Sequence, residues 1–398
     1  MKKLLALLLA LVMVLAFAAC GEKENQAGET DGGAMADIKV GFIFLHDENS
    51  TYDKNFMDAA IAAKEALGLT DEQVLLKTNI PEGNECYEAA ADLADQGCNV
   101  VFANSFGHEP YILKAAKEFP EVEFCHAKGT TAHTENVPNF HNAFASIYEG
   151  RYLAGIAAGM KLNEMIADGK ITAEQAKMGY VGAFTYAEVI SGYTSFYLGA
   201  KSVCPTVTMD VQFTGSWYDE IKEKNAANAL MDNGCVLISQ HADSMGAPSA
   251  CEERNVPNVS YNGSTADACP NTFIVSSKID WSPYFLYMIK SVCQGTAIVD
   301  DWCGEAHEGS VVLTGINKTA AADGTFEKIQ EVAAKLASGE LNVFDTNTFT
   351  VGSVEIEIYE NGEAVRIVYE GYTALTFLSR FNDTVSLTFE KEDDNGTV

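Results

Sequence analysis

Residues 38–67 read IKVGFIFLHDENSTYDKNFMDAAIAAKEAL, and this stretch decides the fold class. Its first eight residues are apolar apart from Lys39 and Gly41, which is typical of a strand buried on both faces of a sheet. Residues 53–67 carry alanine and larger apolar residues at helical spacing. A buried strand followed by a helix predicts a strand–helix–strand unit and hence a mainly parallel sheet.

The same alternation continues to residue 167 and then starts again at residue 177. Two successive α/β units of similar size predict two Rossmann-like lobes, over residues 37–145 and 146–279, with a cleft between them. The predicted strands are 74–80, 99–104, 122–126, 139–143, 177–184, 207–213, 236–240, 258–261 and 273–277. The predicted helices are 84–95, 109–118, 148–167, 189–203, 219–232, 247–254, 283–293 and 326–337.

The C-terminal residues follow a different pattern. Residues 349–359 largely alternate between apolar and polar, Asn361-Gly362 is typical of a tight hairpin turn, and 364–369 would be the returning strand. We therefore expect a small β-rich appendage over residues 346–398.

The first twenty residues resemble an export signal. Lys2 and Lys3 precede an apolar run over residues 4–17, which is short for a membrane span. The run LAFAAC that ends at Cys20 resembles a bacterial lipobox, so we expect residues 1–19 to be removed and Cys20 to carry lipid. Stable anchoring needs two acyl chains, which such a modification supplies. The alternative is an ordinary secretory signal with an incidental cysteine.

Residues 20–36 are polar and glycine-rich and would form a flexible tether. The formal net charge of the whole chain is −30, which repels phosphate backbones and makes nucleic acid an unfavourable partner. Nine further cysteines follow Cys20 without a C-x-x-C pair. Their pairing is not readable from the sequence, and most lie in apolar runs as small core residues do.

Motifs for catalysis are missing from the chain. It lacks the dinucleotide pattern G-x-G-x-x-G, the phosphate loop and the nucleophile elbow G-x-S-x-G. Four histidines cluster in sequence without the spacing of a metal site. These histidines are His108, His126, His133 and His141. We therefore expect no enzyme activity, no metal and no cofactor. A secreted α/β hydrolase or nucleoside-processing enzyme remains the competing class.

Aromatic and polar side chains follow the predicted strands of both lobes. In open α/β sheets ligands bind beyond the carboxyl ends of the strands, so these side chains are candidates to bind a flat heterocycle. The alternative is that they begin helices or act as N-caps. The candidates are Asp47, Tyr52, Asp53, Asn104, Phe106, Trp217, Asp219, His241, Asp243, Asn262, Lys278 and Trp281.

Several of these loops resemble a known family. DENSTYDKNF at 47–56, YEGRYLAG at 148–155, GSWYD at 215–219 and QHADS at 240–244 are similar to motifs of the basic membrane protein family. Its members are lipoprotein substrate-binding subunits of ABC importers that bind purine nucleosides or bases. The resemblance covers roughly residues 37–345. The chain departs from the nucleoside-binding members at Tyr261-Asn262, where they have Val-Asp.

The resemblance implies a type I periplasmic-binding-protein fold, in which a hinge of three crossovers joins the lobes. Returning segments near 280–310 and 311–345 would complete the first and second lobes. It also implies a lipid-anchored, extracytoplasmic monomer that serves an ABC permease and ATPase. A sugar-binding protein of the same fold, or a sensor that does not transport, remains the alternative.

The resemblance further implies roles for the candidate residues. A purine would stack between Tyr52 and Trp217, Asp219 would orient Trp217, and His241 and Trp281 would line the pocket. The polar contacts would come from Asp53, Asn104, Asp243, Asn262 and Lys278.

Overall fold

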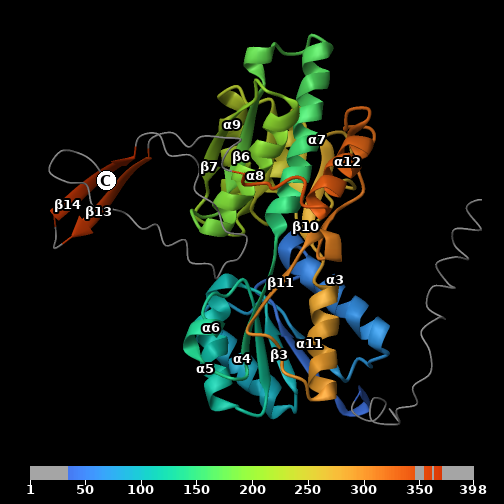
Figure 1. Ribbon diagram of the computed structural model, residues 1–398, viewed down its shortest axis with the longest axis vertical. Coiled ribbons are helices and arrows are strands. Elements are labelled where there is room, and N and C mark those ends of the chain that lie inside the picture. Colours follow the sequence, from blue (N-terminus) through green and yellow to red (C-terminus); the bar gives the residue numbers. More distant parts are fainter. Residues whose placement is uncertain (1–34, 346–353, 361–362, 370–398) are drawn as a thin grey trace, which may run out of the picture.

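The computed structural model describes residues 35–345, 354–360 and 363–369. The predicted signal, Cys20 and nearly all of the predicted tether lie outside these residues. Two six-stranded sheets, each with helices on its faces, form two lobes one above the other (Figure 1). Within the described part of the chain, no helix combines the length and the apolar character needed to cross a membrane.

The first lobe contains a fully parallel sheet with the strand order β11-β5-β4-β3-β1-β2. Parallel strands covered on both faces require apolar side chains throughout, and all four residues of β1 and of β3 are buried. Its strands are β1 (Val40–Ile43), β2 (Val74–Lys77), β3 (Val100–Ala103), β4 (Glu123–Ala127), β5 (Phe140–Ala145) and β11 (Asp301–Gly304). Its helices are α3 (Thr51–Leu67), α4 (Asn84–Asp95), η1 (Phe106–His108), α5 (Glu109–Glu118), α6 (Ala132–Glu135) and α11 (Ser282–Gln294).

The second lobe has the strand order β12-β10-β9-β8-β6-β7, parallel except for the edge strand β12. Its strands are β6 (Lys177–Gly182), β7 (Thr208–Phe213), β8 (Leu237–His241), β9 (Asn258–Tyr261), β10 (Phe273–Ile279) and β12 (Val311–Leu313). Its helices are α7 (Ile147–Ala167), η2 (Ala173–Gln175), α8 (Ala187–Val203), α9 (Glu220–Asp232), α10 (Gly246–Arg254) and α12 (Thr325–Ala337), with η3 (Ala306–Glu308) before β12.

The chain crosses between the lobes at three places: between β5 and α7, between β10 and α11, and between β11 and β12. The predicted fold class, two mainly parallel α/β lobes, is confirmed. The short strands β11 and β12 were missed: β11 reads DWCG, without an apolar run, and β12 has only three residues.

Close helix packing holds the second lobe together. A side chain at Gly155 of α7 would collide with the carbonyl oxygen of Phe196 in α8, and one at Gly199 would collide with that of Tyr152. Only glycine therefore allows the two helices to approach so closely.

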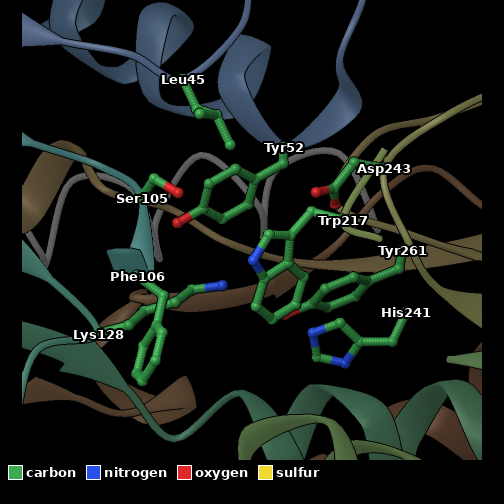
Figure 2. Close-up of a pocket in the computed structure, with 9 residues that line it drawn as sticks. All are labelled: Leu45, Tyr52, Ser105, Phe106, Lys128, Trp217, His241, Asp243 and Tyr261. Carbon is green, nitrogen blue, oxygen red and sulfur yellow. The ribbon is translucent and has the colours of Figure 1, made fainter. Parts of the chain in front are cut away.

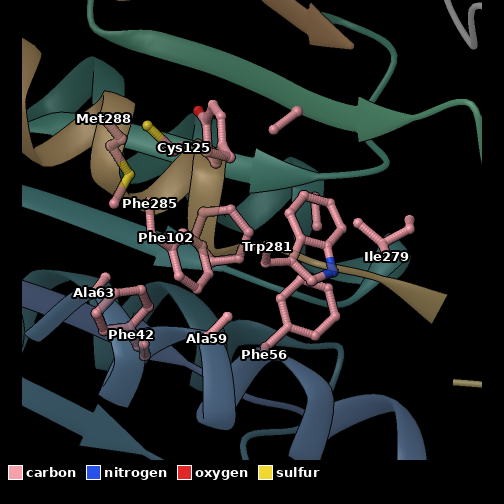
Figure 3. Packing of buried hydrophobic residues seen from close by; sticks show 14 of the residues in the cluster. Phe42, Phe56, Ala59, Ala63, Phe102, Cys125, Ile279, Trp281, Phe285 and Met288 are labelled. Atoms are coloured by element: carbon pink, nitrogen blue, oxygen red, sulfur yellow. The ribbon is translucent and has the colours of Figure 1, made fainter. Parts of the chain in front are cut away.

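The core of the first lobe is aromatic (Figure 3). Trp281, expected to line the pocket, instead lies in this core with 1% of its surface exposed. It stacks on Phe56 with ring centroids 4.5 Å apart. The physical reason is that the chain crosses back to the first lobe just before Trp281, and α11 then packs against α3.

Beyond residue 353 the structure describes an antiparallel hairpin of β13 (Val354–Glu360) and β14 (Glu363–Tyr369). Glu360 pairs with Glu363, so the strands flank the predicted turn at 361–362, which lies outside the described residues. All other residues of the predicted appendage lie outside them too.

Candidate ligand-binding site

A pocket lies between the lobes, at the carboxyl ends of strands from both sheets (Figure 2). The side chains of the two lobes leave only a narrow space between them, part of which is open to solvent. This position matches the place where open α/β sheets bind ligands. The first lobe contributes Leu45, Tyr52, Ser105, Phe106 and Lys128, and the second lobe contributes Trp217, His241, Asp243 and Tyr261.

Aromatic rings make up much of the pocket wall. Trp217 packs edge-on against Phe184, with ring centroids 5.1 Å apart, and lies 5.9 Å from Tyr186. Tyr186 also contacts Phe106 of the opposite lobe at 5.2 Å. The structure thus brings together the predicted residues Tyr52, Phe106 and Trp217 on walls that belong to two lobes.

Tyr52 is held firmly at the start of α3. The Ser50 side chain caps this helix by accepting a hydrogen bond from the backbone N–H of Asp53. The Tyr52 hydroxyl donates to the carbonyl oxygen of Asn104, and Lys128 Nζ lies 4.3 Å from the centre of its ring. The ring is therefore fixed by contacts at its tip and on one face.

The Asp53 and Asn104 side chains are buried, form a hydrogen bond with each other and do not line the pocket. Asn104 Nδ2 donates to Asp53 Oδ1 at 2.7 Å, and Asn104 Oδ1 accepts from the N–H of Leu45 at 3.1 Å. Burial raises the pKa of Asp53, but hydrogen bonds from His46, Asn104 and Ser50 lower it below its usual value. Both side chains thus stabilise the loop after β1.

Asp47 and Asp219 also bond to neighbouring backbone and do not line the pocket. Asp47 accepts from the N–H of Asn49 at 3.1 Å. Asp219 accepts from the N–H of Lys222 at 2.9 Å and so caps α9, as the N-cap alternative expected. Trp217 is linked to Asp243 instead, because its carbonyl oxygen accepts from the Asp243 N–H at 2.9 Å.

Polar side chains of the second lobe lie at the ends of β8 and β9. His241 and Asp243 are buried in the pocket wall. Burial raises the pKa of Asp243 well above its usual range. Asn262 donates to Asp243 Oδ1 at 3.2 Å without lining the pocket itself. Lys278 is half-buried on β10, opposite Val312 of the edge strand, and is not a lining residue either.

Lys128 is a pocket residue that the sequence analysis missed. Its Nζ lies 2.6 Å from Glu188 Oε1, and Glu188 Oε1 lies 3.5 Å from His241 Nε2. The available signal was its position, because Lys128 directly follows β4 just as Asn104 directly follows β3. Leu45, Ser105 and Tyr261 were missed as lining residues as well.

Two of the side chains that line the pocket have buried polar atoms without a hydrogen-bond partner. The Tyr261 hydroxyl and His241 Nδ1 are buried and form no hydrogen bond within the described part of the chain. Because buried polar atoms are normally hydrogen-bonded, these two atoms have hydrogen-bonding capacity that the described residues do not use.

The four histidines that cluster in sequence have separate polar partners in the fold. Across residues 35–345, no three His, Cys, Asp or Glu side chains come close enough together to bind a metal ion. Their nearest polar partners are Ile80 for His108, Ser105 for His126, Asp301 for His133 and Glu123 for His141.

Two mainly parallel α/β lobes with a pocket between them are the architecture of the periplasmic-binding-protein fold. Residues 43–347 match the family model described as ABC transporter substrate-binding protein PnrA-like. The chain therefore belongs to this family, also called the Bmp family, which consists of solute-binding proteins rather than enzymes.

Individual relatives differ in the ligand that they are named for. The chain is 33% identical to the purine-binding protein of Brucella abortus, over 79% of this chain and 85% of that one. It is 28% identical to a putative ABC transporter glucose-binding protein of Haloferax volcanii, over 85% and 83%. The solved solute-binding protein of Conexibacter woesei shares the fold, with a TM-score of 0.63, 22% identity and coverage of 77% and 98%.

Proposed function

We propose that this protein binds a purine base or nucleoside in the pocket between its lobes and delivers it to an ABC permease and ATPase. The observation that carries the proposal is the narrow pocket with aromatic walls from both lobes, chiefly Tyr52 and Trp217. A planar base stacks on such rings with a gain of about 1–3 kcal/mol per ring. The purine-binding relative from Brucella abortus supports the same ligand class.

The polar edge of the base would face the second lobe. The Tyr261 hydroxyl and His241 Nδ1 are unpartnered, and the raised pKa of Asp243 favours a protonated carboxyl that can donate a hydrogen bond. Together these groups would both donate hydrogen bonds to the edge of a heterocycle and accept hydrogen bonds from it. Ligand binding would close the lobes about the three crossovers, and the closed form would dock on the permease.

Isothermal titration calorimetry of the purified protein tests the ligand class. Adenine, hypoxanthine, adenosine and inosine are titrated separately, with glucose and ribose as controls. We expect at least one purine to bind and to quench Trp fluorescence, and neither sugar to do so. Heat from a sugar and none from any purine would refute the proposal.

A sugar ligand is the second candidate, because the Haloferax volcanii relative is named as a glucose-binding protein. Aromatic rings also stack on sugars. Native mass spectrometry of freshly purified protein separates the candidates directly, since the mass of a retained ligand identifies a base, a nucleoside or a hexose.

We also propose that Cys20, which lies outside the described residues, anchors the protein to the extracytoplasmic face of the cell membrane by lipid. The lipobox-like run LAFAAC supports this. Labelling with a clickable fatty acid should mark the wild-type protein and not the Cys20→Ala variant. An unlabelled wild-type protein would contradict the anchor while leaving the ligand proposal intact.

A further inference from the structure

A buried ion pair joins the two lobes beside the pocket. Lys128 follows β4 of the first lobe, and Glu188 lies in the first turn of α8 in the second lobe. Lys128 Nζ and Glu188 Oε1 are 2.6 Å apart, and the side chains are only 6% and 2% exposed. Because the partners come from different lobes, a hinge opening separates them and returns both charges to water.

The two partners carry opposite charges. Burial raises the pKa of Glu188, but Lys128 and His241 lower it to about 2, so Glu188 is ionised at neutral pH. Burial lowers the pKa of His241, and the nearby Lys128 and Arg151 lower it further against the effect of Glu188. His241 is therefore neutral. One cation and one anion face each other, with a neutral imidazole beside them.

Lys128 connects this pair to the pocket. Its ammonium lies 4.3 Å from the centre of the Tyr52 ring, and Lys128 itself lines the pocket. The backbone φ of Lys128 is 65°, in the left-handed region that residues other than Gly and Asn rarely adopt. Such backbone strain persists where surrounding contacts enforce it and is concentrated at binding sites. Glu188 is not a lining residue, so it acts on a ligand only through its neighbours.

Other contacts between the lobes lie close to the ion pair. Tyr186, two residues before Glu188, contacts Phe106 of the first lobe at 5.2 Å. On the other side of the pocket, Thr51 Oγ1 donates to the carbonyl oxygen of Asp243 at 3.2 Å. The pocket is thus closed by contacts on both sides, and the Lys128–Glu188 pair is the charged one among them.

We infer that Glu188 is a positioning residue for ligand binding: it holds Lys128 and His241 in place across the closed cleft, so that affinity includes the formation of this ion pair between the lobes. The inference rests on the proposed function for the identity of the ligand, but not for the closure itself.

A double-mutant cycle tests the inference. The full-length protein and its variants Glu188→Gln, Lys128→Met and the double variant are titrated with adenine and inosine by calorimetry. Glu188→Gln should weaken binding about 30-fold or more, since closure then buries an unpaired ammonium. In the Lys128→Met background the same change should not weaken binding, because no ammonium remains to be paired and the substitution removes a carboxylate that has lost its partner.

Two further measurements separate positioning from a merely structural role. The melting temperature of the ligand-free protein should not change in Glu188→Gln, because the open cleft hydrates residue 188. In small-angle X-ray scattering, this variant at saturating ligand should keep a larger radius of gyration than the wild type. Asp58→Asn is the matched control, since it breaks an exposed ion pair with Lys54 and should change none of these quantities.

The inference is overturned if Glu188→Gln weakens binding equally with and without Lys128, or if it lowers the melting temperature of the ligand-free protein. If glucose binds and purines do not, the proposed function fails and the same cycle with glucose tests the inference. If none of these ligands binds the wild-type protein, the proposed function and the inference both fail.

Discussion

The two lobes share a fold but contribute to the pocket in different ways. In the first lobe, Asp53 and Asn104 bond to each other and to the backbone, and the lobe presents chiefly Tyr52 and Phe106 to the pocket. In the second lobe, His241 and Tyr261 line the pocket with polar atoms that have no partner in the described chain. A polar side chain serves a ligand only with bonding capacity that the fold has not already used.

The largest expected effect is a loss of stability, and it tests the structural role of the Asp53 carboxylate in the first lobe. Asp53→Ala removes the acceptor of the Asn104 amide and of the His46 N–H. We expect the free energy of unfolding to fall by about 2–4 kcal/mol, because hydrogen bonds to a charged group are worth about 1.5–3 kcal/mol each. Calorimetric melting measures this change. Asp58→Ala, on an exposed face of the same helix, is the control, and equal losses in the two variants would contradict the role.

The same carboxylate predicts a pH dependence. The pKa of Asp53 is lowered in the folded protein, so its ionised form stabilises the fold above the unfolded value of about 3.9. This contribution is lost as the pH falls through the lowered folded pKa. The stability difference between wild type and Asp53→Asn should therefore be full at pH 6 and shrink below about pH 4 in urea titrations. A difference that stays constant down to pH 3 would argue against it.

The next largest effect is a loss of purine affinity, and it tests the aromatic residues that both lobes contribute to the pocket wall. Trp217→Ala should weaken purine binding by about ten- to hundredfold, the equivalent of one stacking contact. The melting temperature of the ligand-free protein should change little, because Trp217 is only partly buried. Phe326→Ala, on the exposed face of α12, is the control in the same calorimetric titration. Unaltered affinity in Trp217→Ala would place the base elsewhere.

A smaller effect tests the unpartnered polar atoms of the second lobe. Tyr261→Phe deletes a buried hydroxyl without changing the ring, and should weaken purine binding by about two- to tenfold. Because the hydroxyl has no partner within the described residues, the ligand-free protein should lose no stability. A lowered melting temperature would show that the fold already uses this hydroxyl, and the contrast between the lobes would then disappear.

The smallest effect concerns Lys278, which the resemblance implied as a polar contact. It lies on β10 beside the edge strand and outside the pocket wall. Lys278→Met should change the dissociation constant by less than about twofold, below the cost of one lost hydrogen bond. A loss of about tenfold or more would show that Lys278 contacts the ligand.

The sequence by itself determined the two α/β lobes and the loops that meet at the pocket. Hydrophobic periodicity is local, and parallel strands direct all their carboxyl ends to one edge. The sequence therefore placed Tyr52, Phe106, Trp217, His241 and Asp243 on loops that meet at the pocket wall. The same reasoning placed Asp53 and Asn104 on loops that follow strands of the first lobe, but it did not reveal their hydrogen-bond partners.

Only the tertiary structure decided which of these side chains remain available. Trp281 follows a strand of the second lobe, yet the crossover before α11 carries it into the core of the first lobe, where burying its ring against Phe56 is favourable. Lys128 and Glu188 are sixty residues apart and belong to different lobes, so no local pattern reveals their contact. Their ion pair depends on how the lobes close, which is a property of the whole fold.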